Sequence, residues 1–209
     1  MNTVSQDPAA RRRSRLSLIL VLGMFAAPLA IAWFVLSVFP ELAPKGKVNH
    51  GELVSPVRPL PSFQLQTLSG EALDETFFRG KWTIVYLAQG VCDRPCVEQL
   101  YNIRQVRLAQ GKNIDRLQRL LLWNDEGISA EQRLELQEHF PGQVIVPLRD
   151  QGSPALLQTF VLDAEQPLDA GRVYLVDPLG HLMMSYEADD EPRGMIKDLE
   201  RLLKYSGLG

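Results

Sequence analysis

The 209-residue sequence predicts an α/β sandwich that ends in a β-hairpin and a helix and is preceded by one transmembrane helix. Three observations support this prediction. One uncharged apolar segment near the N-terminus is long enough to cross a bilayer. After residue 60, short β-branched and aromatic runs alternate with segments of helical periodicity. Near the C-terminus, two apolar runs flank a turn sequence and an amphipathic segment follows them.

The apolar segment runs from Leu16 to Phe39, 24 residues without Asp, Glu, Lys, Arg or His. As a helix it reaches roughly 36 Å at about 1.5 Å per residue, more than the hydrocarbon core of about 30 Å. Four arginines precede it and few charges follow it, so the positive-inside rule places the N-terminus in the cytoplasm. A cleaved signal peptide is the alternative, but Phe34 to Pro40 offers no small-x-small cleavage site. We expect an uncleaved anchor.

This anchor divides the chain into four expected regions: a basic cytoplasmic N-terminus (1–15), the transmembrane helix (16–39), a Pro- and Gly-rich linker (40–60) and a single outer domain (61–209). After residue 40 the chain carries 18 Lys and Arg against 24 Asp and Glu. This acidic balance argues against docking on nucleic acid or anionic lipid.

The outer domain shows a regular order of predicted elements. Strands are expected at 63–67, 82–88, 117–124 and 142–148, and helices at 95–111, 129–140 and 153–160. A hairpin over 171–187, with Asp177 to Gly180 at its tip, and a helix over 192–205 close the domain. The order β, β, α, β, α, β, α, β, β, α is that of a thioredoxin-like fold.

The only two cysteines, Cys92 and Cys96, stand between a predicted buried strand and a helix. Unpaired N–H groups and the dipole at a helix N-terminus favour thiolate over thiol. Thiolates act in disulfide exchange and are also soft ligands for Cu(I). A purely structural disulfide is the weaker interpretation, because a loop this short contributes little stability. The spacing leaves a redox couple and a metal pair open.

With these motifs the outer part resembles the Sco/SenC family of membrane-anchored, thioredoxin-like proteins that assist assembly of the copper centre of cytochrome c oxidase. The resemblance is carried by "NHGELVSPVRPLPSFQLQTLSGEAL", "FFRGKWTIVYLAQGVCDRPC" and "VYLVDPLGHLMMSY". It implies that Cys92 and Cys96 are the catalytic residues and the metal ligands. It also implies a location in a bacterial inner membrane with the outer domain in the periplasm, and an oxidase subunit or a copper chaperone as partner.

The sequence departs from the Sco/SenC pattern at two positions and from the pattern of thioredoxin-like redox proteins at a third. Asp169 stands where the third copper ligand, a histidine, is expected, so that ligand is not identified. Asp93 replaces the proline that usually follows the first cysteine. Gly171 occupies about the place where thioredoxin-like redox proteins have a proline opposite the cysteines. A dithiolate still holds Cu(I), but the missing histidine disfavours Cu(II).

The other candidate residues are not assigned a functional role. His50 lies in the expected linker and His139 at the end of a helix, and neither is assigned as a ligand. His181 and Met183 share one face of a strand and Met184 the other, which indicates core packing on one side and exposure on the other. Asp93 and Arg94 are expected to be a solvated pair.

The sequence therefore predicts a membrane-anchored periplasmic protein that assists cytochrome c oxidase biogenesis through Cys92 and Cys96, by thiol/disulfide handling or by Cu(I) delivery. As an enzyme it would be a thiol-disulfide oxidoreductase. Two alternatives stay open: a non-catalytic assembly adaptor that uses its acidic surface, and a general periplasmic thiol-disulfide reductase.

Overall fold

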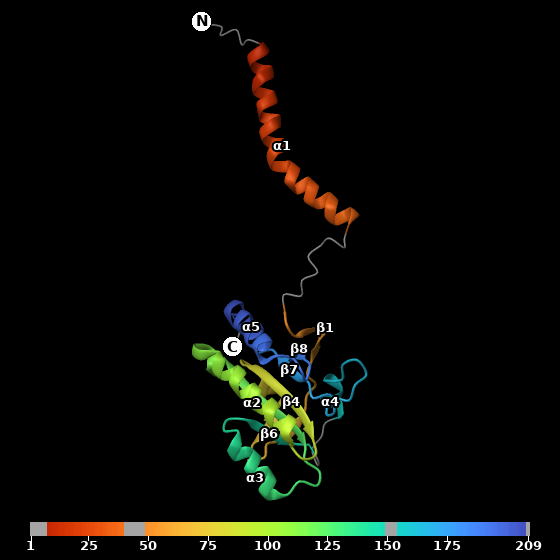
Figure 1. Ribbon diagram of the computed structural model, residues 1–209, viewed down its shortest axis with the longest axis vertical. Helices are drawn as coiled ribbons and strands as arrows, with labels where there is room; N and C mark the ends of the chain where they lie inside the picture. Colours follow the sequence, from red (N-terminus) through yellow and green to blue (C-terminus); the bar gives the residue numbers. More distant parts are fainter. Residues whose placement is uncertain (1–7, 40–48, 149–153, 208–209) are drawn as a thin grey trace. The chain divides into compact units, whose positions relative to one another are not determined.

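The computed structural model describes residues 8–39, 49–148 and 154–207. The chain separates into two compact units, Met1–Val48 and Asn49–Gly209. In the first unit, helix α1 (Pro8–Val38) contains an apolar stretch, Ser17–Val38, with a mean hydropathy of 2.5. Its apolar side chains are exposed along this stretch, as a helix in contact with lipid requires. Figure 1 shows the helix bent along its length, and Pro28 inside it removes one backbone hydrogen bond.

The second unit is built on a six-stranded mixed sheet with the order β1-β8-β7-β4-β5-β6. Strands β4, β5 and β6 are parallel, while β1, β8, β7 and β4 pair antiparallel in that order. The strands are β1 (Glu52–Pro59), β4 (Trp82–Gln89), β5 (Leu117–Asn124), β6 (Val144–Pro147), β7 (Val173–Val176) and β8 (His181–Tyr186). Strand β4 is buried from Trp82 to Ala88, because helices or hairpins cover both faces of the sheet at its centre.

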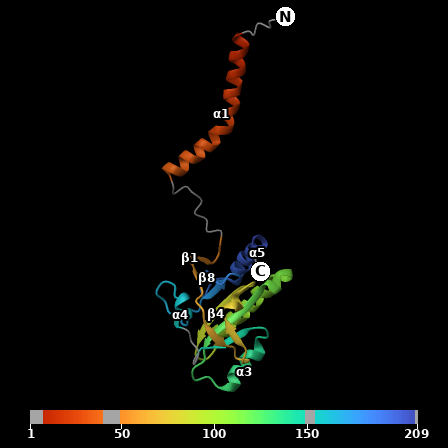
Figure 2. The same ribbon diagram turned by 180° about the vertical axis from the view of Figure 1, so that it is seen from behind.

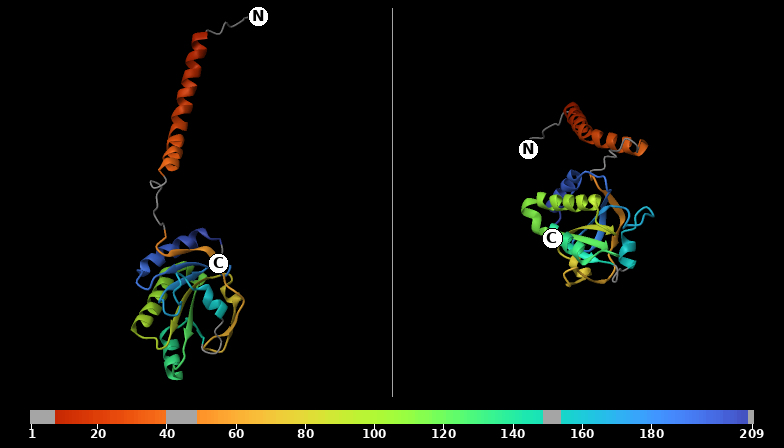
Figure 3. Two further views of the ribbon diagram at one scale, coloured as in Figure 1. Left: turned by 90° about the vertical axis from the view of Figure 1, so that its right-hand side faces the viewer. Right: turned by 60° about the horizontal axis from the view of Figure 1, so that its bottom comes forward.

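Two layers cover the sheet (Figures 1 and 2). Helices α2 (Arg94–Ala109), α3 (Ala130–His139) and α5 (Pro192–Tyr205) pack on one face, and the 3-10 helix η3 (Gly111–Arg116) follows α2. The hairpin β2 (Gln64–Gln66) and β3 (Ala72–Asp74), the 3-10 helix η2 (Glu75–Phe78) and helix α4 (Pro154–Thr159) cover the other face. Figure 3 shows α4 on the side of the sheet away from α2. The predicted α/β sandwich with a C-terminal hairpin and helix is confirmed.

Two strands lie where the sequence indicated none. Strand β1 falls within the expected linker and pairs with β8, so the folded unit begins near Asn49 rather than Leu60. Strand β3 pairs with β2 in a region for which no strand was expected. Strand β3 is only three residues long, and β1 buries only Val54 and contains prolines, which edge strands tolerate.

A buried carboxylate fixes the start of the folded unit. Asp198 of α5, 2% exposed, accepts hydrogen bonds from the backbone N–H groups of His50 (2.8 Å) and Gly51 (3.0 Å). Its Oδ1 lies 3.1 Å from Nδ1 of His50, and the hydroxyl of Tyr186 in β8 donates to Oδ2, the oxygen that also accepts the two backbone N–H groups. Burial and the charge of Asp198 raise the pKa of Tyr186 above its ordinary value. These bonds attach the membrane-proximal residues to α5 and β8.

The contact between Gly194 and His50 gives a stability prediction. A Cβ at Gly194 would lie 2.7 Å from Cβ of His50, so Gly194→Ala should destabilise the domain by roughly 1–3 kcal/mol, although Ala is ordinarily the better helix residue. In a His50→Gly background the cost should vanish, because the opposing Cβ is gone. Urea denaturation followed by tryptophan fluorescence measures both. An equal cost in the two backgrounds would contradict the proposed close contact.

Candidate functional site

The two cysteines form a disulfide at the start of α2. Strand β4 ends at Gln89, Cys92 lies in the connecting turn, and Cys96 is the third residue of α2. The sulfurs of Cys92 and Cys96 are bonded to each other, with their Cα atoms 5.1 Å apart. The structure thus brings together both residues that the sequence singled out.

Asp93 caps the helix that carries Cys96. Its Oδ1 accepts the backbone N–H of Cys96 at 3.4 Å, and Arg94 and Pro95 occupy the two positions before Cys96. Asp93 is exposed, as expected, and it also has this capping role, which was not expected. The signal was present, because Asp is a preferred N-cap and Pro is favoured in the first turn. Asp93 also acts on Tyr86 of β4: burial first, and then the Asp93 charge, raises the pKa of Tyr86.

The two sulfurs differ in accessibility. Cys96 is 6% exposed and belongs to the core between the sheet and its helices, whereas Cys92 is half-buried at the edge of that core. Cys92 also lines a pocket of about 240 Å³. An attacking thiolate therefore has access to Cys92 first, and Cys96 is the buried leaving group.

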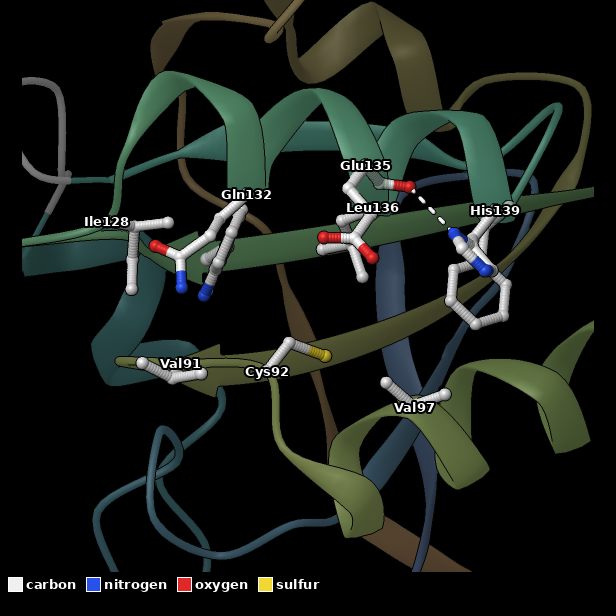
Figure 4. Close-up of a pocket in the computed structure, with 10 residues that line it drawn as sticks. Val91, Cys92, Val97, Ile128, Gln132, Glu135, Leu136 and His139 are labelled. Atoms are coloured by element: carbon white, nitrogen blue, oxygen red, sulfur yellow. Dashed lines mark hydrogen bonds between the residues drawn. The ribbon is translucent and has the colours of Figure 1, made fainter.

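The pocket beside Cys92 is mainly apolar. Figure 4 shows Cys92 lying between helix α3 and Val97 of α2. Apolar side chains form most of the wall, and polar side chains of α3 lie along one side. The lining consists of Val91, Cys92, Val97, Trp123, Ile128, Gln132, Glu135, Leu136, His139 and Phe140. Such a surface is suited to an apolar side chain next to a reacting sulfur.

Hydrogen bonds hold the walls of this pocket in place. The indole Nε1 of Trp123 donates to the carbonyl of Gly90 at 2.8 Å, which ties the cysteine turn to β5. Arg133 of α3 pairs with the fully buried Asp125 and donates from Nη2 to the carbonyl of Ile128 at 2.5 Å. The two contacts of Arg133, with Asp125 and with Ile128, fix the turn between β5 and α3. The contact between Trp123 and Gly90 joins segments 33 residues apart, so no local sequence pattern predicts it.

On the other side of the cysteine turn lie the residues that depart from the family pattern. Asp169 accepts a hydrogen bond from the side chain of Gln89, the last residue of β4. Gly171 lines a second hollow together with Tyr86 and Pro95. Its φ of +62° is open to glycine but not to proline, whose ring fixes φ near about −65°. The backbone here differs from the one that a proline would give.

The three histidines take different positions. His50 is held by Asp198, and His181 lies 3.1 Å from Asp177 within the β7–β8 hairpin. Met184 is 1% exposed and Met183 is only partly buried, as the alternation predicted. His139 lines the Cys92 pocket, and no local sequence pattern predicts this proximity, because it results from the packing of α3 beside α2.

The donor set limits what metal the site can hold. Among the residues that the structure describes, no group of three or more His, Cys, Asp or Glu side chains is arranged to bind a metal ion. The reduced cysteines would supply two thiolates, which fit Cu(I) and lack the nitrogen donors that Cu(II) prefers.

Comparison with known proteins identifies the family. A family model described as "Transmembrane-like, thioredoxin-like, C-terminal domain" matches residues 82–206, more than half of the chain. The chain belongs to this family. A comparison with curated protein sequences finds no match.

Solved structures of Sco proteins share the fold of this family member. Copper-bound ScoI of Bradyrhizobium japonicum is 21% identical, with a TM-score of 0.52 over 68% of this chain and 98% of that one. Copper-bound yeast Sco1 is 18% identical, with a TM-score of 0.59 over 73% and 96%. BsSco, described with a disulfide switch and as a member of the Sco family of cytochrome c oxidase assembly proteins, is 13% identical, with a TM-score of 0.54 over 72% and 96%. The Sco-like thioredoxin fold is confirmed.

The charge of Asp93 gives a redox prediction. A carboxylate beside two sulfurs disfavours thiolates and hence the reduced pair, whereas Asp93→Asn keeps an oxygen acceptor for the Cys96 N–H. Asp93→Asn should raise the reduction potential by about 10–30 mV, equivalent to roughly 0.5–1.4 kcal/mol for a two-electron couple. Equilibration in glutathione buffers with thiol alkylation measures the potential.

Asp93→Ala serves as the matched comparison. It removes the same charge and also the cap, so it should additionally destabilise the oxidised protein by about 1 kcal/mol. An unchanged or lower potential in Asp93→Asn would show that the carboxylate does not oppose the thiolates.

Proposed function

We propose that this protein exchanges its Cys92–Cys96 disulfide with a cysteine pair of a partner protein during assembly of cytochrome c oxidase. One observation supports the proposal above all: the disulfide lies at a helix N-terminus, and its accessible sulfur opens onto an apolar pocket. The similar protein BsSco is described both with a disulfide switch and as a cytochrome c oxidase assembly protein, which supports the choice of pathway.

The exchange balances within the two cysteine pairs. A thiolate of the partner attacks Sγ of Cys92, the bond to Cys96 breaks, and Cys96 leaves as a thiolate near the N-terminal N–H groups of α2. The partner's second thiolate then attacks its own sulfur in the mixed disulfide and releases Cys92. Two electrons and two protons pass from the partner's thiols to the cysteine pair. The reverse sequence reduces a partner disulfide, and the relative potentials set the direction.

Cu(I) carriage by the reduced pair is the second candidate. Two thiolates one helical turn apart suit this soft ion as a cargo, and the structures of ScoI and yeast Sco1 with the same fold are described with copper bound. The expected third position, Asp169, is engaged by Gln89. We therefore place thiol exchange ahead of copper delivery.

For the location, we propose that residues 1–15 lie in the cytoplasm, residues 16–39 span a bacterial inner membrane and the folded unit lies in the periplasm. The apolar helix with arginines before it supports this topology. An oxidising compartment allows the disulfide to persist between reactions. A cytochrome c oxidase subunit or a copper chaperone is the partner that this location allows.

The roles of the two cysteines give a trapping prediction. Cys96→Ser should accumulate a mixed disulfide with the partner through Cys92, because the resolving thiol is absent. Cys92→Ser should trap several-fold less, because Cys96 is 6% exposed. Non-reducing electrophoresis of membranes and mass spectrometry of the adduct measure this. Normal oxidase assembly in a strain with both cysteines replaced by Ser would favour the adaptor alternative, and equal trapping of unrelated proteins would favour a general reductase.

Copper binding gives a separate prediction. The reduced protein should bind about one equivalent of Cu(I), lose it on Cys92→Ser or Cys96→Ser, and bind Cu(II) far more weakly. Asp169→His tests the departure from the family pattern, and it should strengthen Cu(II) binding if this position faces the ion. Anaerobic titration against a chromogenic Cu(I) chelator measures the affinity. Retention of Cu(I) in both single-Ser variants would exclude the dithiolate site.

A further inference from the structure

The Cys92 pocket continues along α2 into a second hollow. This hollow, about 430 Å³, is lined by Arg94, Val97, Glu98, Tyr101, Arg104, His139 and Phe140. Val97, His139 and Phe140 line both hollows, so the two form one groove between α2 and the end of α3. We call it the α2–α3 groove. Val97 and Tyr101 remain 40% and 53% exposed in it, so its apolar wall is open to a ligand.

The far end of the α2–α3 groove is positively charged. Arg104 of α2 forms no ion pair with a carboxylate within the described part of the chain. Behind it, Arg119 of β5 is 3% exposed and donates from Nη2 to the carbonyl of Pro141 at 2.7 Å, just after α3. Its Nε and Nη1 are buried and have no partner among the described residues. Burial, followed by the charges of Arg107 and Arg104, lowers the pKa of Arg119 to about 10.

Arg104, Arg107 and Arg119 form a positively charged cluster, which a nearby negative charge would stabilise. A buried guanidinium without a carboxylate is costly, and two further arginines nearby raise the cost. Arg107 donates from Nε to the carbonyl of Leu117, and within the described ranges no carboxylate forms an ion pair with it. Of the acidic side chains of the groove, Glu135 lines the hollow beside Cys92, whereas Glu98 lines the second hollow, six residues before Arg104 on α2. A carboxylate from outside would complement the Arg104 end.

We propose that the α2–α3 groove binds an extended segment of the partner protein that carries the reacting cysteine, a large apolar residue beside it and an acidic residue about four positions away. The spacing follows from α2. Cys92 is bonded to Cys96, which lies eight residues before Arg104, about 12 Å along a helix. An extended segment covers that length in about four residues. This inference rests on the proposed exchange at Cys92 and adds the sequence class of the substrate.

The test uses the full-length Cys96→Ser protein in detergent and a set of synthetic peptides. Each peptide carries one cysteine activated as a mixed disulfide with a coloured aromatic thiol, with Leu beside it. Cys92 thiolate attacks the peptide sulfur, the aromatic thiolate leaves, and its absorbance reports the rate. Glu, Gln or Lys stands four residues before or after the cysteine.

In one of the two orientations, the Glu peptide should react roughly 3- to 10-fold faster than the Gln peptide, and the Lys peptide more slowly still. Added salt should reduce the difference. Arg104→Gln should abolish the preference for Glu, whereas the control Arg193→Gln, an exposed arginine of α5 with the same charge change, should keep it. Val97→Ser should slow all Leu peptides and keep the Glu preference.

The outcomes separate this inference from the proposed function. The activated thiol without a peptide should react equally with the Cys96→Ser protein and its Arg104→Gln derivative, which shows that Cys92 is competent. If Cys92 reacts but Glu, Gln and Lys peptides do so at equal rates, the groove assignment is wrong while exchange stands. If Cys92 reacts with none of the activated disulfides, the proposed thiol exchange is itself wrong. A third outcome would mean that a second copy of the chain occupies the groove: the Glu preference is lost as the protein concentration rises, and the protein forms dimers that the Arg104→Gln substitution dissociates.

Discussion

The position of the two sulfurs depends on the connection between β4 and α2. Strand β4 is buried on both faces and pairs with β5 and β7, so its end at Gln89 is fixed by the whole sheet. The hydrogen bond from Trp123 to Gly90 and the Asp93 cap then determine where the turn stops and the helix starts. The reactive geometry is thus a consequence of sheet packing, and its precision comes from groups outside the cysteines.

Those elements that have a clear period or a continuous apolar run were predictable. β4, β5, α2 and α5 follow this rule, because each buries a full face or stripe against the core. β1 was not predictable, since it is an edge strand with one buried residue and prolines, and its pairing with β8 comes from tertiary structure. The same limit explains the site: Cys92 and Cys96 are adjacent in sequence, whereas the neighbourhood of His139, Asp125 and Arg119 exists only after α3 and β5 pack beside α2.

Asp93 and Arg104 place opposite charges near the two ends of the functional surface. The carboxylate at the N-terminus of α2 offsets part of the helix field that favours thiolates. Further along the same helix, Arg104 adds positive charge beside the buried Arg119. A segment that brings an acidic residue to Arg104 is oriented by this asymmetry, because its carboxylate is attracted to one end and repelled from the other.

Because one rigid helix carries both Cys96 and Arg104, the separation between reaction and recognition does not vary. A flexible loop would pay conformational entropy each time it aligned the two sites, whereas α2 is held by α5 and the sheet before any partner arrives. The hydrogen bonds to Asp198 attach the start of the folded unit to α5. The helix that packs against α2 therefore also holds the first residues of this unit. A single helical layer thus holds the start of the folded unit, the disulfide and the residues of the proposed partner recognition.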